Sequence, residues 1–182
     1  KRPPALHEVR EQPIPRPGGG SPSARLYRPC PGTLPLLIYF HGGGWVAGNV
    51  DSHDALCRDL AAMIGCLVLS VDYRLAPEHP FPAAFDDALL AFRWAREHHA
   101  ELDASDRIAV AGDSAGGNLS AAVSLFTKDE GGPCFQGLLY PAVDLTRETR
   151  SYELFGEGFL LTRRAMHWFM DHYLPNASDR RD

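Results

Sequence analysis

The 182-residue sequence lacks the features that define several large classes of protein. Its four cysteines form no C-x-x-C pair, which argues against a zinc site and a dense disulfide framework, so we expect buried free thiols. Its longest apolar run, residues 36–40, is far too short to span a bilayer. The formal net charge of −5 gives no reason to expect nucleic acid or a membrane as a partner.

The chain also has no internal repeats, no low-complexity tract, no G-x-G-x-x-G fingerprint and no P-loop. No apolar run follows the basic residues at its start, so no signal peptide is visible and a cytoplasmic location is expected. What remains is an ordinary composition, 45% hydrophobic and 23% charged, in a length that suits one domain with a real core.

Apolar runs and helical spacings alternate along the chain. Strands are expected over residues 9–14, 23–27, 34–40, 66–71 and 135–143. Helices are expected over residues 52–64, 81–97 and 162–173, with Thr162 as the cap of the last. Residues 145–158 are polar and read as irregular. The alternation predicts an α/β fold with a mainly parallel, twisted sheet flanked by helices.

The stretch from Arg107 to Asn118 organises the rest of the chain. A short apolar strand leads into Gly112-Asp113-Ser114-Ala115-Gly116, which matches the G-x-S-x-G nucleophile elbow, and a helix follows. The serine of such an elbow sits in a strained turn that lifts its side chain above the sheet. Gly112 and Gly116 remove the side chains that would collide where strand and helix come closest. The pattern predicts a nucleophilic serine at position 114.

A run of three glycines, His41-Gly42-Gly43-Gly44, follows the strand expected over residues 34–40. Glycines there leave backbone N–H groups bare and able to approach a ligand. Taken alone the run is a flexible turn. Together with a serine elbow it favours an oxyanion hole, because acyl transfer builds negative charge on a carbonyl oxygen that aimed N–H groups stabilise. His41 is expected to hold this loop through a backbone hydrogen bond rather than to act as a base.

Four linked motifs carry a resemblance to a known family. They are His41-Gly42-Gly43-Gly44-Trp45, Tyr73-Arg74-Leu75-Ala76-Pro77-Glu78, Gly112–Asn118 and Tyr140-Pro141. In this order they resemble the hormone-sensitive-lipase family of microbial carboxylesterases, which are α/β-hydrolases. The resemblance covers almost the whole chain.

The resemblance implies a set of site residues and a reaction. Ser114 is implied to be the acyl nucleophile. The backbone N–H groups of Gly43, Gly44 and Ala115 are implied to form the oxyanion hole, with Gly42 as a weaker candidate. The implied substrates are esters of short acyl chains, and neither a metal nor an organic cofactor is implied. Phe159, Leu160 and Trp45 are candidates for an apolar acyl or alcohol site, although ordinary packing also explains them.

The sequence departs from the family at its C-terminal end. The triad order in this fold is Ser, then Asp or Glu, then His, and the triad Asp and His are not found in this chain. It resembles the first six strands of an eight-stranded sheet, as a single partial domain over residues 1–182. Residues 1–20 are interpreted as a remnant of the N-terminal region, and residues 145–182 as a segment contributing to a cap.

Three explanations stay open for the missing triad residues. The chain is a fragment, or its last strands reside on a second polypeptide, or a histidine outside the family pattern, such as His79, serves as base. An uncovered strand over residues 136–143 predicts a homo-oligomer, or pairing with a chain that supplies the missing strands. Three functions compete: a serine carboxylesterase, a catalytically incompetent chain with a binding or assembly role, and an amide or peptide hydrolase using the same site.

Overall fold

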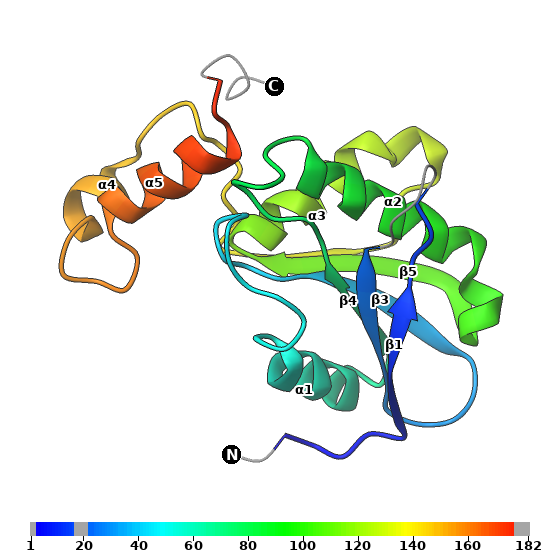
Figure 1. Cartoon of the computed structure of the whole chain (residues 1–182). Helices are drawn as coiled ribbons and strands as arrows, with labels where there is room; N and C mark the ends of the chain where they lie inside the picture. The colour runs from blue at the N-terminus through cyan, green and yellow to red at the C-terminus, as the bar shows by residue number, and fades with distance from the viewer. Residues whose placement is uncertain (1–2, 17–21, 177–182) are drawn as a thin grey trace.

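The computed structural model describes residues 3–16 and 22–176, and a six-stranded sheet forms its centre (Figure 1). The strands are β1 (Glu8–Pro13), β2 (Ser23–Arg28), β3 (Leu34–Phe40), β4 (Leu67–Asp72), β5 (Ala104–Asp113) and β6 (Gln136–Leu139). They lie in the order β1-β2-β4-β3-β5-β6. The pairs β1–β2 and β2–β4 are antiparallel, whereas β4, β3, β5 and β6 run parallel. The α/β prediction of a mainly parallel sheet is therefore confirmed.

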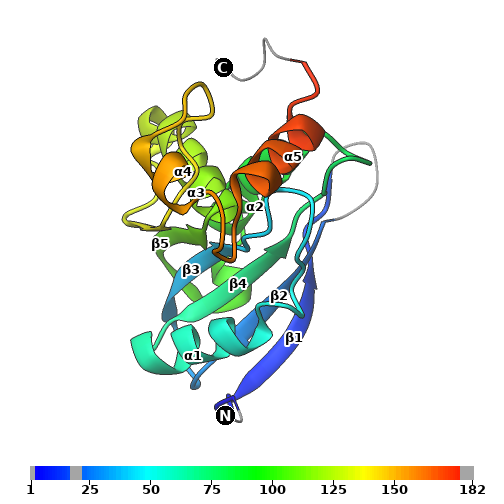
Figure 2. The same cartoon turned by 90° about the vertical axis from the view of Figure 1, so that its left-hand side faces the viewer.

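Helices cover both faces of this sheet (Figures 1 and 2). They are α1 (Asp54–Ile64), α2 (Ala83–Glu97) and α3 (Ala115–Phe126). Short 3-10 helices follow α2 at His99–Leu102 and α3 at Lys128–Glu130. Alternate residues of β3 divide between two apolar clusters: Ile38 packs with α2 and α3, and Leu37 packs with α1. Both faces of β3 and β4 are buried, which explains why their sequences are almost continuously apolar.

Two further helices, α4 (Arg150–Phe155) and α5 (Arg163–Tyr173), lie outside the layers that flank the sheet (Figures 1 and 2). The Thr162 hydroxyl accepts a hydrogen bond from the Ala165 N–H at 3.1 Å, so the predicted cap of α5 is confirmed. The expectation of irregular structure over residues 145–158 is wrong at α4. This helix has six residues, which is too short for its periodicity to show in the sequence.

Two other expectations need correction. The strand expected over residues 135–143 ends at Leu139, because Tyr140 adopts a φ of 37° and Pro141 has no N–H to donate. The strand does form an edge of the sheet, as expected. The thiols are free, but only Cys57 and Cys66 are buried. Cys30 lies in a turn and Cys134 lies just before the edge strand, and both are exposed.

No helix among residues 3–16 and 22–176 combines the length and the apolar character needed to cross a membrane.

A buried carboxylate ties the N-terminal segment to the core. Asp87 on α2 is 1% exposed and accepts hydrogen bonds from the Arg74 backbone N–H and guanidinium, and from Arg16 at 2.6 Å. Both arginines are partly shielded from water, with side chains 30% and 26% exposed. A carboxylate buried this deeply is stable only when its partners satisfy it, so this cluster fixes where the loop after β4 meets α2.

We predict that Asp87→Asn lowers the free energy of unfolding by about 2 kcal/mol, because two guanidinium groups lose their charged partner. The neighbouring residue Asp86 is exposed, so Asp86→Asn should change stability by no more than about 0.5 kcal/mol. Urea unfolding followed by circular dichroism measures both variants. Equal losses of unfolding free energy in the two variants would contradict a stabilising role for the Asp87 cluster.

Candidate active site

Ser114 occupies a strained turn between β5 and α3. Its φ is 51° and its ψ is −114°, a conformation that residues with a side chain rarely adopt. The glycines on either side permit the turn. A Cβ atom at Gly116 would lie 1.9 Å from the Phe40 carbonyl oxygen, and one at Gly112 would lie 2.4 Å from the same atom. The steric reason predicted for the G-x-S-x-G spacing is thus present, with the end of β3 as the obstacle.

The three glycines after β3 form a tight loop. Gly43 has a φ of 127° and Gly44 a φ of 61°, values that strongly favour glycine. The Gly43 carbonyl accepts hydrogen bonds from the N–H groups of Val46 and Ala47, at 3.2 and 2.9 Å. A Cβ atom at Gly44 would lie 2.3 Å from the Phe169 ring of α5, which packs against the loop. The glycine sequence is therefore needed for both the conformation and the packing.

The backbone N–H groups of this region divide into two kinds. Those of Gly43, Gly44 and Ala115 donate to no acceptor within the described residues. The Gly42 N–H, in contrast, donates to Oδ1 of Asp113 at 2.9 Å. Unpaired N–H groups beside a serine hydroxyl can stabilise negative charge that forms there. Gly42 is not one of them, because its N–H already has an acceptor.

His41 is fully buried and braces the loop from inside. Its Nδ1 lies 2.8 Å from the Gly42 carbonyl oxygen, which can only accept, so Nδ1 carries the hydrogen. The ring stacks on Tyr73 at 4.3 Å between centroids, and the Tyr73 hydroxyl donates to the His41 carbonyl at 2.6 Å. Burial lowers the pKa of His41. This geometry agrees with a loop-holding role for His41.

Asp113 connects the elbow to the loop. Its Oδ1 accepts from the Tyr39 hydroxyl at 2.8 Å as well as from Gly42, and Nε2 of His53 lies 3.4 Å away. Burial by itself would raise the pKa of Asp113, but these donors, His53 foremost, outweigh it and hold the pKa below its usual value. The carboxylate is therefore charged at neutral pH and is stabilised in that form by folding.

A carboxyl group with a lowered pKa in the folded state adds stability above its unfolded pKa and loses it as the pH falls through the folded value. We therefore predict that acidification from about pH 6 to about pH 3 destabilises the wild type more than Asp113→Asn. Exposed Asp106 provides the matched control, and Asp106→Asn should keep the wild-type acid slope. Urea unfolding midpoints measured across this pH range test the prediction. Equal decreases of the midpoint in the wild type and in Asp113→Asn would contradict it.

An apolar cleft of about 870 Å³ opens above the serine. Gly43, Gly44 and Ser114 lie in its wall. The stripe Ala165, Met166, Phe169 and Met170 of α5 lines the other side. Of the three apolar candidates from the sequence, Trp45 and Leu160 line the cleft. Phe159 instead packs edge-on against Phe155, with ring centroids 5.3 Å apart.

No imidazole within the described residues hydrogen-bonds the Ser114 hydroxyl. His167 contacts Glu148 at 2.6 Å, and His172 contacts the Trp168 carbonyl at 2.8 Å. His79, the alternative base, is exposed in a turn. The part of the chain that the structure covers also contains no group of three His, Cys, Asp or Glu residues that could hold a metal ion.

The fold and the serine turn together are those of an α/β hydrolase, and comparison with known proteins gives the family. The sequence profile of the alpha/beta hydrolase fold family matches residues 37–182. Carboxylic ester hydrolase LipN of Mycobacterium tuberculosis is 52% identical to this chain, covering 96% of it and 49% of that protein. Ethyl acetate hydrolase of Pseudomonas putida is 40% identical, covering 87% of this chain and 52% of that protein.

Solved structures agree with these matches. An α/β hydrolase from the metagenome of Lake Arreo superposes with a TM-score of 0.95 at 45% identity, covering 100% of this chain and 59% of that one. The hyperthermophilic esterase from Pyrobaculum calidifontis gives 0.93 at 43% identity, covering 98% and 60%. The chain belongs to the α/β-hydrolase fold family, among the carboxylesterases of the hormone-sensitive-lipase family that its motifs resemble. It spans about half the length of the curated relatives it matches.

Proposed function

We propose that the intact protein is a carboxylic ester hydrolase that works through a serine acyl-enzyme. The observation that carries the proposal is the placement of Ser114. Its strained turn lies in the wall of an apolar cleft beside Gly43 and Gly44, whose N–H groups have no acceptor among the described residues. The names of the relatives, which are esterases and carboxylic ester hydrolases, support the same reaction.

In the proposed reaction the Ser114 oxygen attacks the ester carbonyl and its proton passes to a general base. The N–H groups of Gly43, Gly44 and Ala115 stabilise the resulting oxyanion. The tetrahedral intermediate then expels the alcohol, which takes the proton from the base, and leaves an acyl-enzyme. Water, activated by the same base, attacks the acyl group, and the reverse proton transfers release the acid and free Ser114.

The base and its orienting carboxylate are proposed to come from outside the described residues. A remainder of a longer protein or a second chain would supply them, since each of the eight histidines lies within the described part and none reaches Ser114. The same observation favours the second candidate for this 182-residue chain taken alone: a serine that is present but not activated, in a chain with at most a binding or assembly role.

Short acyl esters are the proposed substrates. The side chains of α5 that line the cleft, Phe169 among them, are apolar and suit an acyl chain. The name of one relative, ethyl acetate hydrolase, supports a short one. The same unpaired N–H groups would serve an amide carbonyl equally well. Parallel assays with an ester and the matching anilide distinguish esterase from amidase or peptidase activity.

Replacing Ser114 with alanine tests the proposal in the intact protein. Ser114→Ala should lower kcat for p-nitrophenyl acetate by at least about 10⁴-fold, because the nucleophile is removed. Ser124 is a matched control: it lies on α3, the helix that follows Ser114, and its hydroxyl donates to the Ser120 backbone carbonyl, so Ser124→Ala should keep kcat within about twofold. A Ser114→Ala enzyme that retains wild-type kcat would exclude the proposed mechanism.

The domain interpretation is also a proposal. Residues 145–182 are proposed to contribute to a cap, because side chains of α5 and of the segment before it line the same cleft as Ser114. Residues 1–20 are proposed to be a remnant of an N-terminal region. Its described part forms β1, which pairs only with β2 at the edge of the sheet. Within the described residues, the rest of the chain forms one partial α/β-hydrolase unit.

The edge strand β6 generates a prediction about assembly. Leu138 and Leu139 are 37% and 42% exposed, and Phe135 just before them is 67% exposed. Strand edges with apolar side chains recruit further strands. We predict that the isolated 182-residue chain sediments as oligomers or aggregates, and that Leu138→Lys shifts it toward monomer. A monodisperse monomer of the wild-type chain in analytical ultracentrifugation would contradict this.

A further inference from the structure

Asp113 is the meeting point of three segments that the chain separates widely. Oδ1 accepts the Gly42 N–H at 2.9 Å and the Tyr39 hydroxyl at 2.8 Å, and it faces Nε2 of His53 at 3.4 Å. The other carboxylate oxygen fills the space beside Gly42: a Cβ atom there would lie 2.2 Å from Oδ2. A side chain at position 42 would therefore collide with the carboxylate of Asp113.

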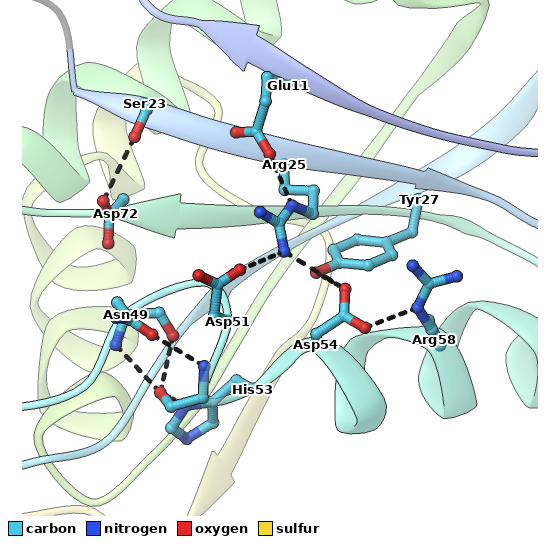
Figure 3. Close-up of polar contacts among 11 residues, drawn as sticks. Glu11, Ser23, Arg25, Tyr27, Asn49, Asp51, His53, Asp54, Arg58 and Asp72 are labelled. Atoms are coloured by element: carbon cyan, nitrogen blue, oxygen red, sulfur yellow. Dashed lines mark hydrogen bonds and ion pairs between the residues drawn. The ribbon is translucent and has the colours of Figure 1, made fainter. Parts of the chain in front are cut away.

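The groups around this carboxylate are themselves held in place. Tyr39 is 1% exposed, so water does not compete with Asp113 for its hydroxyl. Nδ1 of His53 lies 2.9 Å from the Ser52 hydroxyl. The Ser52 backbone N–H in turn donates to Oδ1 of Asn49 at 2.8 Å. Figure 3 shows His53 packed beside Asn49 at the start of α1.

This clamp determines the direction of the loop's N–H groups. Both polar groups of Gly42 are engaged, its N–H by Asp113 and its carbonyl by Nδ1 of His41. In a trans peptide the carbonyl and the following N–H point in opposite directions. Fixing the Gly42 carbonyl toward His41 therefore turns the Gly43 N–H away from that ring. Asp113 also directly precedes Ser114 in the chain. The residue that holds Gly42 is therefore bonded directly to the nucleophile.

We propose that Asp113 is a positioning residue of the oxyanion hole, holding Gly42 so that the N–H groups of Gly43 and Gly44 face the carbonyl bound at Ser114. The proposal rests on the proposed esterase function. It assigns to Asp113 no contact with the substrate. Loss of this positioning should weaken the stabilisation of the transition state, because that stabilisation depends on hydrogen-bond donors that are already oriented before the reaction.

The test measures kcat and KM of the intact protein with p-nitrophenyl acetate. Asp113→Ala should lower kcat about 10- to 100-fold while KM stays within about threefold, because the misplaced donors act on the transition state. Asp113→Asn keeps an oxygen that accepts the Gly42 N–H, so its kcat should stay within about fivefold of wild type. Rescue by asparagine distinguishes positioning from a requirement for the negative charge.

A second pair of variants keeps the test valid if Asp113→Ala does not fold. Tyr39→Phe removes one donor to the carboxylate and should lower kcat about 3- to 10-fold at unchanged KM. Tyr27 is the matched control, because it belongs to the same apolar cluster as Tyr39. Its hydroxyl donates instead to Asp54 at 3.0 Å (Figure 3). Tyr27→Phe should keep kcat within about twofold.

The possible failures are distinguishable. A fully active Ser114→Ala enzyme removes the esterase proposal itself. With Ser114→Ala inactive, the role of Asp113 is overturned by any of three results. These are a folded Asp113→Ala enzyme with kcat within about threefold of wild type, an Asp113→Asn enzyme as impaired as Asp113→Ala, or equal effects of Tyr39→Phe and Tyr27→Phe.

Discussion

The close approach of helix α3 to the end of strand β3 is the constraint on which the rest of this structure depends. At Gly116 no side-chain atom fits, because a Cβ would lie 1.9 Å from the Phe40 carbonyl oxygen. The helix can begin this near the sheet only if the chain turns sharply at Ser114, at the cost of a rare backbone conformation. The contact also brings the end of β3, and with it the glycine loop, beside the serine.

The glycine loop leaves some of its backbone N–H groups without hydrogen-bond acceptors among the described residues. Polar backbone groups near a protein core normally find partners. Here the carbonyls of Gly42 and Gly43 are engaged, by His41 and by the turn through Ala47, while the N–H groups of Gly43 and Gly44 have no acceptor among the described residues. Unpaired donors held rigidly in a cleft destabilise the empty site and favour a ligand that brings an oxygen with negative charge. Polar groups left unsatisfied in this way are more typical of a functional site than of a structural turn.

The sequence predicted those features that depend on local pattern. The apolar run of β3 and the elbow spacing around Ser114 each follow from short-range steric and periodic rules, and Thr162 caps α5 as predicted. It did not predict features that depend on contacts between distant segments. The acceptor of the Gly42 N–H lies 71 positions away at Asp113, so no local pattern reports it. The exposure of Cys134 likewise follows from its position beside an edge strand, and α4 is too short to leave a periodic signal.

A crystal structure of the intact protein treated with a p-nitrophenyl alkylphosphonate tests the proposed site most directly. We expect a covalent bond from the Ser114 oxygen to phosphorus, with one phosphonate oxygen about 2.7–3.1 Å from the N–H groups of Gly43, Gly44 and Ala115. The Gly42 N–H should still donate to Asp113. A phosphonate bonded elsewhere, or one on Ser114 whose oxygens contact none of these three N–H groups, would contradict the proposed site.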